Sequence, residues 1–337
     1  GWPAVGSGRH TLIAAPTGSG KTLAAFLTGL DELVRLGLGD GELTDATRVL
    51  YVSPLKALAN DIQRNLIEPL AEITALADEM RTPIPEIRVG VRTGDTTARD
   101  RALHVKRPPH VLITTPESLF ILLTTERGRH ALKSVRTLIL DELHAVAPNK
   151  RGSHLSLTVE RLCDLAEGPV TRIGLSATQK PIEEVARFLT GRSREGASPE
   201  PRHTGATFSP EPERTSGGAQ LDVAIIDAGH KRQMDLSVEL PDGFELGPVA
   251  THEQWAQTLD QVAKLVEAHR TTLLFVNTRR LVERLAHLLS DRLGEENVAA
   301  HHGSLSKETR FDAEQRLKAG TVKVVVATAS LELGIDV

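Results

Sequence analysis

TLIAAPTGSGKT, residues 11–22, places a short apolar run before a turn rich in small residues, and a helical pattern starts at Lys21. In such a loop between a strand and a helix, backbone N–H groups can approach phosphate oxygens, and the helix N-terminus adds its partial positive charge. Lys21 supplies a cation for the β- and γ-phosphates of a nucleotide, and Thr22 supplies a hydroxyl to Mg²⁺. The segment is interpreted as a P-loop, although Ala15 occupies a position where the full pattern has glycine. The residues expected to contact the nucleotide are Thr17, Gly18, Ser19, Gly20, Lys21 and Thr22.

Strand and helix patterns alternate along the chain after this loop. Apolar runs that predict strands include RVLYVSP (48–54), IRVGVRT (87–93), HVLITTP (110–116) and TRIGLSAT (171–178). Helical patterns separate most of them, which is typical of a parallel sheet covered by helices. Several runs end in Thr, Ser, Asp or Glu, so polar residues should gather at the carboxyl edge of the sheet.

The alternation breaks at residues 192–220, where Pro, Gly, Ser, Thr and charged residues dominate, and this predicts a flexible surface insertion. A second loop-rich stretch follows at 241–248, and the alternation then begins again and continues to Val337. The sequence therefore predicts an α/β fold of two domains with parallel sheets. The first domain is expected over 1–240, with the insertion, and the second over 249–337, unfinished.

The composition excludes some classes of protein. No apolar run reaches the roughly 18 residues of a membrane span, and the 25% of charged residues is typical of a soluble globular chain. The net charge of −4 leaves nucleic acid open as a partner, because a local basic groove is sufficient for binding. The single cysteine, Cys163, excludes an internal disulfide and a cysteine-based metal cluster; we expect it to be a small buried residue in a cytoplasmic protein.

TLILDELH, residues 137–144, is an apolar strand that runs into two acids. Asp141 at the strand tip can hold Mg²⁺ through water, and Glu142 can orient and deprotonate an attacking water, which is the division of labour that phosphoryl transfer needs. An acidic pair after a strand is more often a solvated turn, and His144 alone would more often be a surface histidine. A P-loop in the same sheet favours the functional interpretation.

GLSAT, residues 174–178, is another strand that ends in hydroxyl groups. Ser176 and Thr178 can cap the next helix, or they can bond to the DELH acids or His144 and so report the nucleotide state elsewhere. The P-loop, DELH and SAT segments, in this order, resemble a superfamily 2 helicase motor of the DExH type.

Further segments agree with this resemblance over nearly the whole chain outside 192–220. They are PLKALAND, RTGDT and TTPESL in the first domain, and LLFVNTRR, HHGSLS and VVVATASLELGIDV in the second. The residues of four segments resemble in particular the corresponding motifs of the large helicase-related (Lhr) proteins. These segments are RTGDT, ITTPESL, HHGSLS and ATASLELGID. The resemblance implies two RecA-like P-loop NTPase domains that use ATP and Mg²⁺.

The resemblance also implies roles for individual residues. It gives catalytic roles to Lys21, Asp141, Glu142 and His144, and it directs Gly334 and Asp336 toward the nucleotide. A protein that tracks a strand without reading its sequence needs donors to phosphates. The donors implied here are Lys56, Thr93, Gly94, Thr115, Asn277, Arg279, His302, Gly303 and Thr328. The remaining positively charged stretch, HVKRPPH (104–110), is interpreted as a surface loop.

Two parts of the family pattern have no counterpart in the sequence. Only GWPAVGSGRH stands before the P-loop strand, without the glutamine of the adenine-reading segment, and no residues follow Val337. In the family, the next helix carries arginines at the γ-phosphate, and an arginine finger contributes about 10³–10⁵ in rate. We therefore expect a fragment that binds ATP and hydrolyses it poorly by itself.

The favoured hypothesis is an ATP-dependent helicase that translocates on single-stranded DNA and unwinds DNA or RNA–DNA duplexes. ATP would close the two domains on each other and hydrolysis would open them. The 3′-to-5′ direction and a link to DNA repair come from the resemblance alone. An ATP-dependent RNA helicase and a non-processive nucleic-acid clamp or remodeller stay open, and strand displacement separates a helicase from a clamp. A small-molecule kinase would leave the second domain's motifs unexplained.

Overall fold

The computed structural model describes residues 2–16, 19–40, 43–54, 56–177, 181–191, 223–228, 235–240, 251–328 and 331; the side chains of 2, 40, 56–65, 252 and 307 are outside this description. The chain divides into two compact units, Gly1–His230 and Lys231–Val337. The sequence predicted the change of domain between 240 and 249, about ten residues later. The predicted insertion at 192–220 lies outside the described residues.

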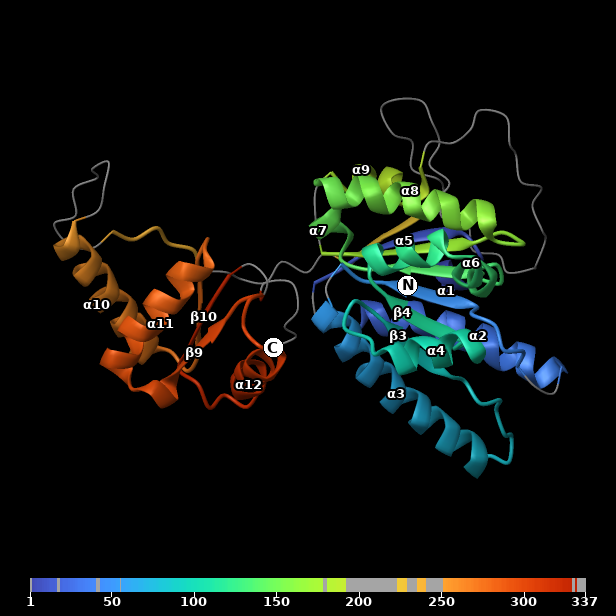
Figure 1. Ribbon diagram of the computed structural model, residues 1–337, viewed down its shortest axis with the longest axis horizontal. Coiled ribbons are helices and arrows are strands. Elements are labelled where there is room, and N and C mark those ends of the chain that lie inside the picture. The colour runs from blue at the N-terminus through green and yellow to red at the C-terminus, as the bar shows by residue number, and fades with distance from the viewer. Residues whose placement is uncertain are drawn as a thin grey trace. The chain divides into compact units, whose positions relative to one another are not determined.

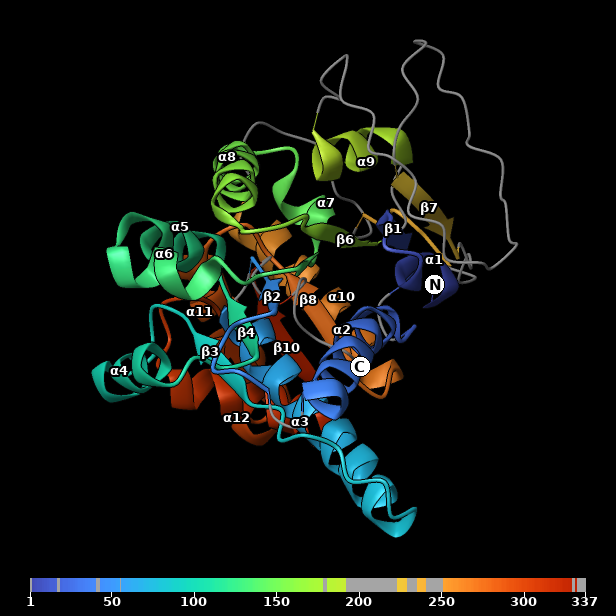
Figure 2. The same ribbon diagram turned by 90° about the vertical axis from the view of Figure 1, so that its right-hand side faces the viewer.

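Unit 1 is built on a parallel sheet whose strands follow the order β3-β4-β2-β5-β6-β1-β7 (Figures 1 and 2). The strands are β1 (His10–Ala14), β2 (Val49–Val52), β3 (Val89–Arg92), β4 (Val111–Thr114), β5 (Thr137–Leu140), β6 (Thr171–Ser176) and β7 (Val223–Asp227). The helices are α1 (Trp2–Gly6), α2 (Lys21–Asp40), α3 (Lys56–Glu79), α4 (Ala98–Lys106), α5 (Pro116–Thr124), α6 (Glu126–Leu132), α7 (Leu143–Val146), α8 (Lys150–Leu165) and α9 (Ile182–Thr190).

Helices cover both faces of this sheet, and β2, β4 and β5 are therefore buried along their whole length. Helices α5 to α9 lie on one face and α1 to α3 on the other (Figure 1). Along β2, Leu50 and Val52 pack toward the first group of helices, whereas Val49 and Tyr51 pack toward the second. Cys163 on α8 is half-buried against the first core and accepts a hydrogen bond from Arg172 Nη2 at 3.3 Å.

Unit 2 repeats this design on a smaller scale. Its described strands are β8 (Thr272–Phe275), β9 (Val298–His301) and β10 (Val324–Ala327), which are parallel in the order β8-β10-β9. They alternate with helices α10 (His252–Ala268), α11 (Arg279–Leu293) and α12 (Lys307–Lys318) and the short 3₁₀ helix η1 (Glu295–Asn297). The predicted α/β fold with parallel sheets is thus confirmed.

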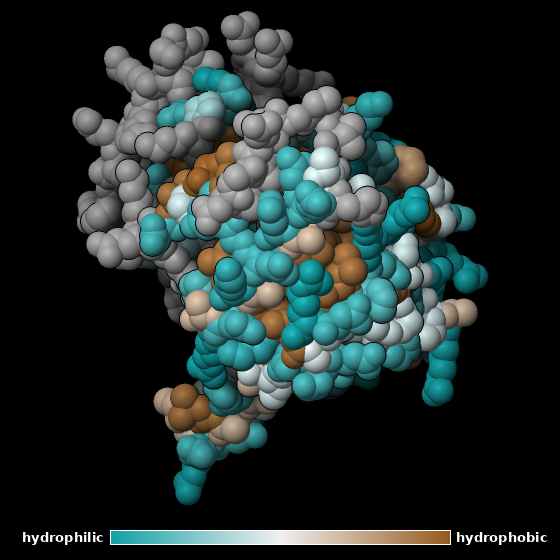
Figure 3. Space-filling view, turned by 90° about the vertical axis from the view of Figure 1, so that its left-hand side faces the viewer, coloured by the Kyte–Doolittle hydropathy of each residue, from teal (hydrophilic) through white to brown (hydrophobic). Residues whose placement is uncertain are grey.

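On the face that Figure 3 shows, hydrophilic side chains predominate among the described residues, with apolar ones between them. The far end of α3 projects beyond the sheet of unit 1 (Figure 2), and Leu76 and Met80 are 57% and 68% exposed on it. No helix within the described ranges combines the length and the apolar character that crossing a membrane requires.

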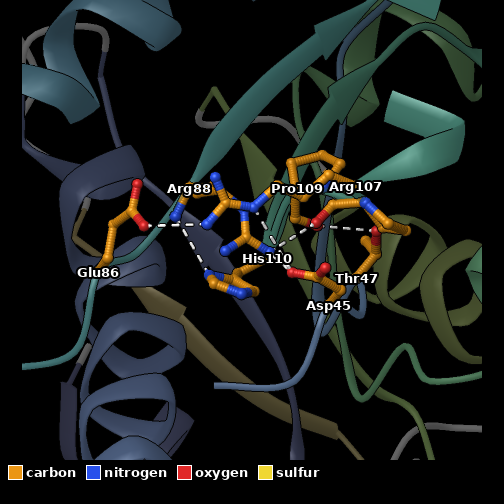
Figure 4. A network of polar contacts seen from close by, with 8 residues as sticks. Asp45, Thr47, Glu86, Arg88, Arg107, Pro109 and His110 are labelled. Carbon is orange, nitrogen blue, oxygen red and sulfur yellow. Dashed lines mark hydrogen bonds and ion pairs between the residues drawn. The ribbon is translucent and has the colours of Figure 1, made fainter. Parts of the chain in front are cut away.

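The interpretation of HVKRPPH as a surface loop is wrong at both of its ends. His104 to Lys106 form the last turn of α4, and His110 is 1% exposed. The buried end belongs to a polar network at the amino edge of the sheet, where β2, β3 and β4 begin (Figure 4). This edge is the one opposite the predicted site.

The network ties three chain segments together. Arg88 Nη2 donates to Asp45 Oδ1 at 2.5 Å, and the Arg88 backbone N–H donates to His110 Nδ1 at 3.1 Å. Thr47 Oγ1 donates to the Pro109 carbonyl oxygen at 2.8 Å. Burial, and then the charge of Arg88, lowers the pKa of His110 to about 4. His110 is therefore neutral in the folded state at neutral pH, and its Nδ1 is a hydrogen-bond acceptor.

His110 makes the stability of unit 1 depend on pH. Its folded-state pKa is lowered from an ordinary value near 6.5, so the unfolded chain takes up this proton first. The contribution of His110 is complete above pH ~6.5 and is lost as the pH falls toward about 4. His110→Asn keeps an acceptor near Nδ1 but does not titrate. In urea unfolding between pH 6.5 and 4, we expect the variant to lose less stability than the wild type, by up to about 1.4 kcal/mol per pH unit; parallel pH dependences would contradict this.

Candidate functional site

The strand order divides the carboxyl edge of the unit 1 sheet into two neighbouring regions. The ends of β1, β5 and β6 are adjacent and lead into the P-loop, the DELH acids and SAT. The ends of β2, β4 and β3 are also adjacent and lead into PLKALAND, TTPESL and RTGDT. Because neighbouring strands lie about 4.8 Å apart, the segments within each region can act on one ligand.

The P-loop leaves β1 beside SAT and enters α2. The Ala15 N–H donates to the Ser176 carbonyl oxygen at 3.1 Å, which continues the β1–β6 ladder into the loop. Gly20 has φ +76°, a left-handed conformation that favours glycine, and the Ala24 N–H bonds to its carbonyl oxygen at 3.0 Å. Lys21 is the first residue of α2 and is only 7% exposed. Ser19 is exposed and Thr22 half-buried, whereas Thr17 and Gly18 lie outside the described residues.

The two acids follow β5 and are both buried. Asp141 is 3% and Glu142 6% exposed, and the Asp141 N–H donates to the Val52 carbonyl oxygen at 2.9 Å. The Glu142 N–H turns back to Asp141 Oδ1 at 2.8 Å. Glu142 has φ 50° and ψ 43°. A non-glycine residue in this left-handed region costs on the order of 1–3 kcal/mol and is held there by its surroundings, so the backbone at Glu142 is constrained.

Burial and the repulsion between the two acids favour a positive charge next to this pair. The pKa of Asp141 is raised to about 6, first by burial and next by the charge of Glu142. Burial also raises the pKa of Glu142, and the charge of Lys21 opposes the rise in both acids. Mg²⁺ is bound in proteins through one or two carboxylates together with phosphate and water oxygens. Asp141, with the hydroxyl of Thr22 on the neighbouring helix, fits this donor set.

Tyr51 belongs to the site and was missed by the sequence reasoning. Its hydroxyl donates a hydrogen bond to Asp141 Oδ2, and its ring stacks on Phe26 of α2 with centroids 5.1 Å apart. Tyr51 is fully buried, and burial followed by the charge of Asp141 raises its pKa well above the ordinary value. A tyrosine in an otherwise aliphatic buried strand was the available signal, because a buried phenol needs a polar partner.

His144 connects the acid pair to the SAT segment. The Ala177 N–H donates to His144 Nδ1 at 3.1 Å, so the proton of the neutral ring is on Nε2. Nε2 lies 3.1 Å from Glu142 Oε2 and can donate to it. Ser176 Oγ lies 3.5 Å from the same Nδ1. Thr178, the second hydroxyl that the sequence analysis selected, lies outside the described residues.

The predicted strand-binding residues of unit 1 lie at the other region of the edge. Gly94 is exposed in the turn after β3. The Thr93 N–H donates to Thr96 Oγ1 at 2.8 Å, and Thr93 itself is 6% exposed. Thr115 is 3% exposed and caps α5, because its hydroxyl accepts from the Ser118 N–H and lies 3.0 Å from Ser118 Oγ. Lys56 begins α3, and its side chain is outside the described residues.

The predicted strand-binding residues of unit 2 also gather at a carboxyl edge. Asn277 and Arg279 are exposed after β8, and Arg279 Nη1 donates to Ser304 Oγ at 2.5 Å next to the exposed Gly303. His302 differs from the expectation, since its ring is 2% exposed and its Nε2 lies 2.8 Å from Glu283 Oε1. Thr328 follows β10 and is half-buried; Gly334 and Asp336 are outside the described residues.

Comparison with known families gives two matches along the chain. Residues 1–186 match the DEAD/DEAH box helicase family, and residues 256–337 match the helicase conserved C-terminal domain. These ranges coincide with the parts of units 1 and 2 that carry the candidate residues.

Individual relatives agree with these matches. The chain is 46% identical over 98% of its length to the ATP-dependent helicase Lhr-Core protein 2 of Thermococcus barophilus, and 45% identical to the Lhr-Core helicase of Methanothermobacter thermautotrophicus. It spans 36% of the length of each of these relatives. Among solved structures, the Mycobacterium smegmatis helicase Lhr bound to ssDNA and AMP-PNP superposes with a TM-score of 0.79 at 46% identity, covering 99% of this chain and 39% of that one.

Proposed function

The chain belongs to the DEAD/DEAH box helicase family, and from this membership we propose that it is the motor of an ATP-dependent helicase that acts on single-stranded DNA. The observation that supports the proposal most strongly is the buried acid pair Asp141–Glu142, whose pKa values the charge of Lys21 lowers. It lies on the same sheet edge as three segments that suit phosphate binding.

The P-loop residues of the proposed motor bind ATP. Lys21 neutralises the β- and γ-phosphates, and the N–H groups at the start of α2 approach their oxygens. Asp141 and Thr22 would hold Mg²⁺, which supplies charge neutralisation at the phosphates when bound. Tyr51 keeps the Asp141 carboxylate oriented toward that position.

Glu142 is the proposed base for hydrolysis. It orients a water and accepts its proton as the water oxygen bonds to the γ-phosphorus and the bond to the ADP oxygen breaks. Burial raises the pKa of Glu142, which makes it a better proton acceptor. His144 donates Nε2–H to Glu142 and accepts from the Ala177 N–H. A displacement of the Glu142 side chain would therefore move His144 and, through it, the backbone after β6.

Single-stranded DNA is the proposed track. The Mycobacterium smegmatis relative that binds ssDNA and AMP-PNP shares 46% identity with this chain. The RNA-bound helicase Mss116 shares 15% identity, and this likeness concerns the fold alone. Strand contacts are proposed at Gly94 in unit 1 and at Arg279 and Gly303 in unit 2, and movement requires these two sets to hold the strand in turn during ATP turnover. The 3′-to-5′ direction and the unwinding of RNA–DNA hybrids are part of the same proposal.

A strand-displacement assay, with the longest available protein that contains this chain, tests this function. The substrates are DNA duplexes and RNA–DNA hybrid duplexes, each with a single-stranded tail at the 3′ or the 5′ end. Each substrate is incubated with the protein and either ATP or AMP-PNP. We expect displacement only with ATP and only from the 3′-tailed substrates. Retention of the protein on the tail without displacement would instead identify a nucleotide-dependent clamp, and displacement only from RNA tails would identify an RNA helicase.

A further inference from the structure

Two arginines of unit 1 belong to the surroundings of RTGDT (92–96), Arg92 as its first residue and Arg101 through hydrogen bonds to its backbone, and neither was assigned a role above. Arg92 is the last residue of β3 and directly precedes Thr93. Arg101 is on α4, and its Nη2 donates to the Gly94 carbonyl oxygen at 2.9 Å and lies 3.5 Å from the Thr93 carbonyl oxygen. Arg101 therefore holds its guanidinium against the loop in which Gly94 is exposed.

Within the described parts of the chain, no carboxylate forms an ion pair with Arg92 or Arg101, and the bonds of Arg101 are to neutral carbonyl oxygens. The nearby Asp100 accepts from the Thr97 hydroxyl at 2.7 Å and the Thr97 side chain caps α4. Most of the ten N–H donors of the two guanidinium groups are thus available to a ligand.

The two charges also disfavour each other. Burial lowers the pKa of Arg92, and the charge of Arg101 lowers it further. The charge of Arg92 in turn contributes, after burial, to the lowered pKa of His104 one turn along α4. Cations that lie together without a counter-ion are stabilised by an anion placed between them. Guanidinium groups bind phosphate oxygens in a forked geometry, which makes phosphate the anion that fits best.

We propose that Arg92 and Arg101 together bind one backbone phosphate of the nucleic-acid strand at the RTGDT loop. The proposal rests on the proposed function, because it identifies a further contact of the same strand. Both side chains belong to the end of β3 and its following helix, at the far end of the sheet from β1 and the P-loop. The phosphate is therefore one of the strand and not one of the nucleotide.

The salt dependence of binding measures this contact. For single strands, the slope of log K against log[salt] is about −0.7 for each phosphate that is neutralised. Fluorescence anisotropy with labelled oligothymidylate, over a series of salt concentrations, gives the slope for each variant. We expect the slope of Arg92→Gln/Arg101→Gln to be smaller in magnitude by about 0.7, the loss of one phosphate. The two single variants should show non-additive losses of affinity, because they share one partner.

A matched control separates a contact from a general effect of charge. Arg99 is on the same helix, exposed, two positions from Arg101 and so on a different face, and Arg99→Gln removes the same charge. Its slope should equal that of the wild type, and Arg92→Lys, which keeps the charge, should retain the wild-type slope. Thermal unfolding of each variant verifies that it is folded.

Three results would overturn the proposal. The first is an unchanged salt slope in the folded double variant. The second is a decrease of the slope in Arg99→Gln as large as that in the double variant. The third is a decrease of about 0.7 in each single variant that adds to two phosphates in the double variant. If the wild type itself binds oligothymidylate without a dependence on salt, the proposed strand-binding function fails, and this proposal with it. Wild-type binding with an unaffected double variant contradicts the Arg92–Arg101 site alone.

Discussion

Replacing Glu142 with glutamine is expected to slow ATP hydrolysis by about 10²–10⁴-fold, the usual contribution of a general base, while ATP still binds. Glutamine has the shape of glutamate and its amide oxygen can accept from His144 Nε2, but it cannot take the proton of the attacking water. The left-handed backbone conformation at φ 50° costs glutamate and glutamine about the same free energy, so the loop conformation should persist.

Burial and, after it, the charge of Glu142 raise the pKa of Asp141, and the variant removes the second of these causes. Metal binding at Asp141 should therefore persist, or extend to lower pH. Steady-state hydrolysis and competition with a fluorescent ATP analogue measure the two properties separately, in the longest available protein that contains this chain. Glu126→Gln, an equivalent change at an exposed residue of α6, is the matched control and should leave both unchanged. Hydrolysis within a few-fold of the wild type would exclude Glu142 as the base.

Tyr51→Phe is expected to lower hydrolysis by about 10- to 100-fold at neutral pH and limiting Mg²⁺, since a hydrogen bond to a charged group contributes about 1.5–3 kcal/mol. The phenyl ring keeps the stacking on Phe26, so the core around it should stay packed. The Tyr51 hydroxyl lowers the pKa of Asp141, and its loss raises that pKa above about 6. Because a metal-binding carboxylate must be deprotonated, protons then compete with Mg²⁺ at a higher pH.

The pH profile and the Mg²⁺ requirement distinguish this role from a purely structural one. The acidic limb of the profile should move to higher pH, and the Mg²⁺ concentration for half-maximal rate should rise at pH 7. Saturating Mg²⁺ should restore most of the activity. A lower rate with an unshifted profile and an unchanged Mg²⁺ requirement would mean that Tyr51 contributes to packing only.

The fold followed from patterns that are local in the sequence. The helical pattern that starts at Lys21 predicted where α2 begins, and the structure begins α2 at this residue. The acids at the tip of β5 could be found for the same reason, since an apolar run that ends in charge marks the end of a buried strand. Such signals depend only on neighbouring residues, and they survive folding when the element is long and regular.

Interactions between distant segments could not be read in this way. Tyr51 and Asp141 are 90 residues apart, and only the β2–β5 pairing brings them together. His110 appeared to belong to a basic surface loop because the partners that bury it come from residues 45–47 and 88. A local pattern also cannot show which polar groups are already used. Thr115 caps a helix and His302 faces Glu283, so their side chains are less available to a strand than the sequence suggested.

The central claim is that hydrolysis at the Lys21–Asp141–Glu142 site drives movement along a nucleic-acid strand. The most direct measurement compares strand displacement by the wild type and by Glu142→Gln, on a 3′-tailed duplex, with ATP occupancy and substrate binding matched. We predict displacement by the wild type and none by the variant, although the variant binds both ATP and the tail. Unimpaired displacement by Glu142→Gln would contradict the claim.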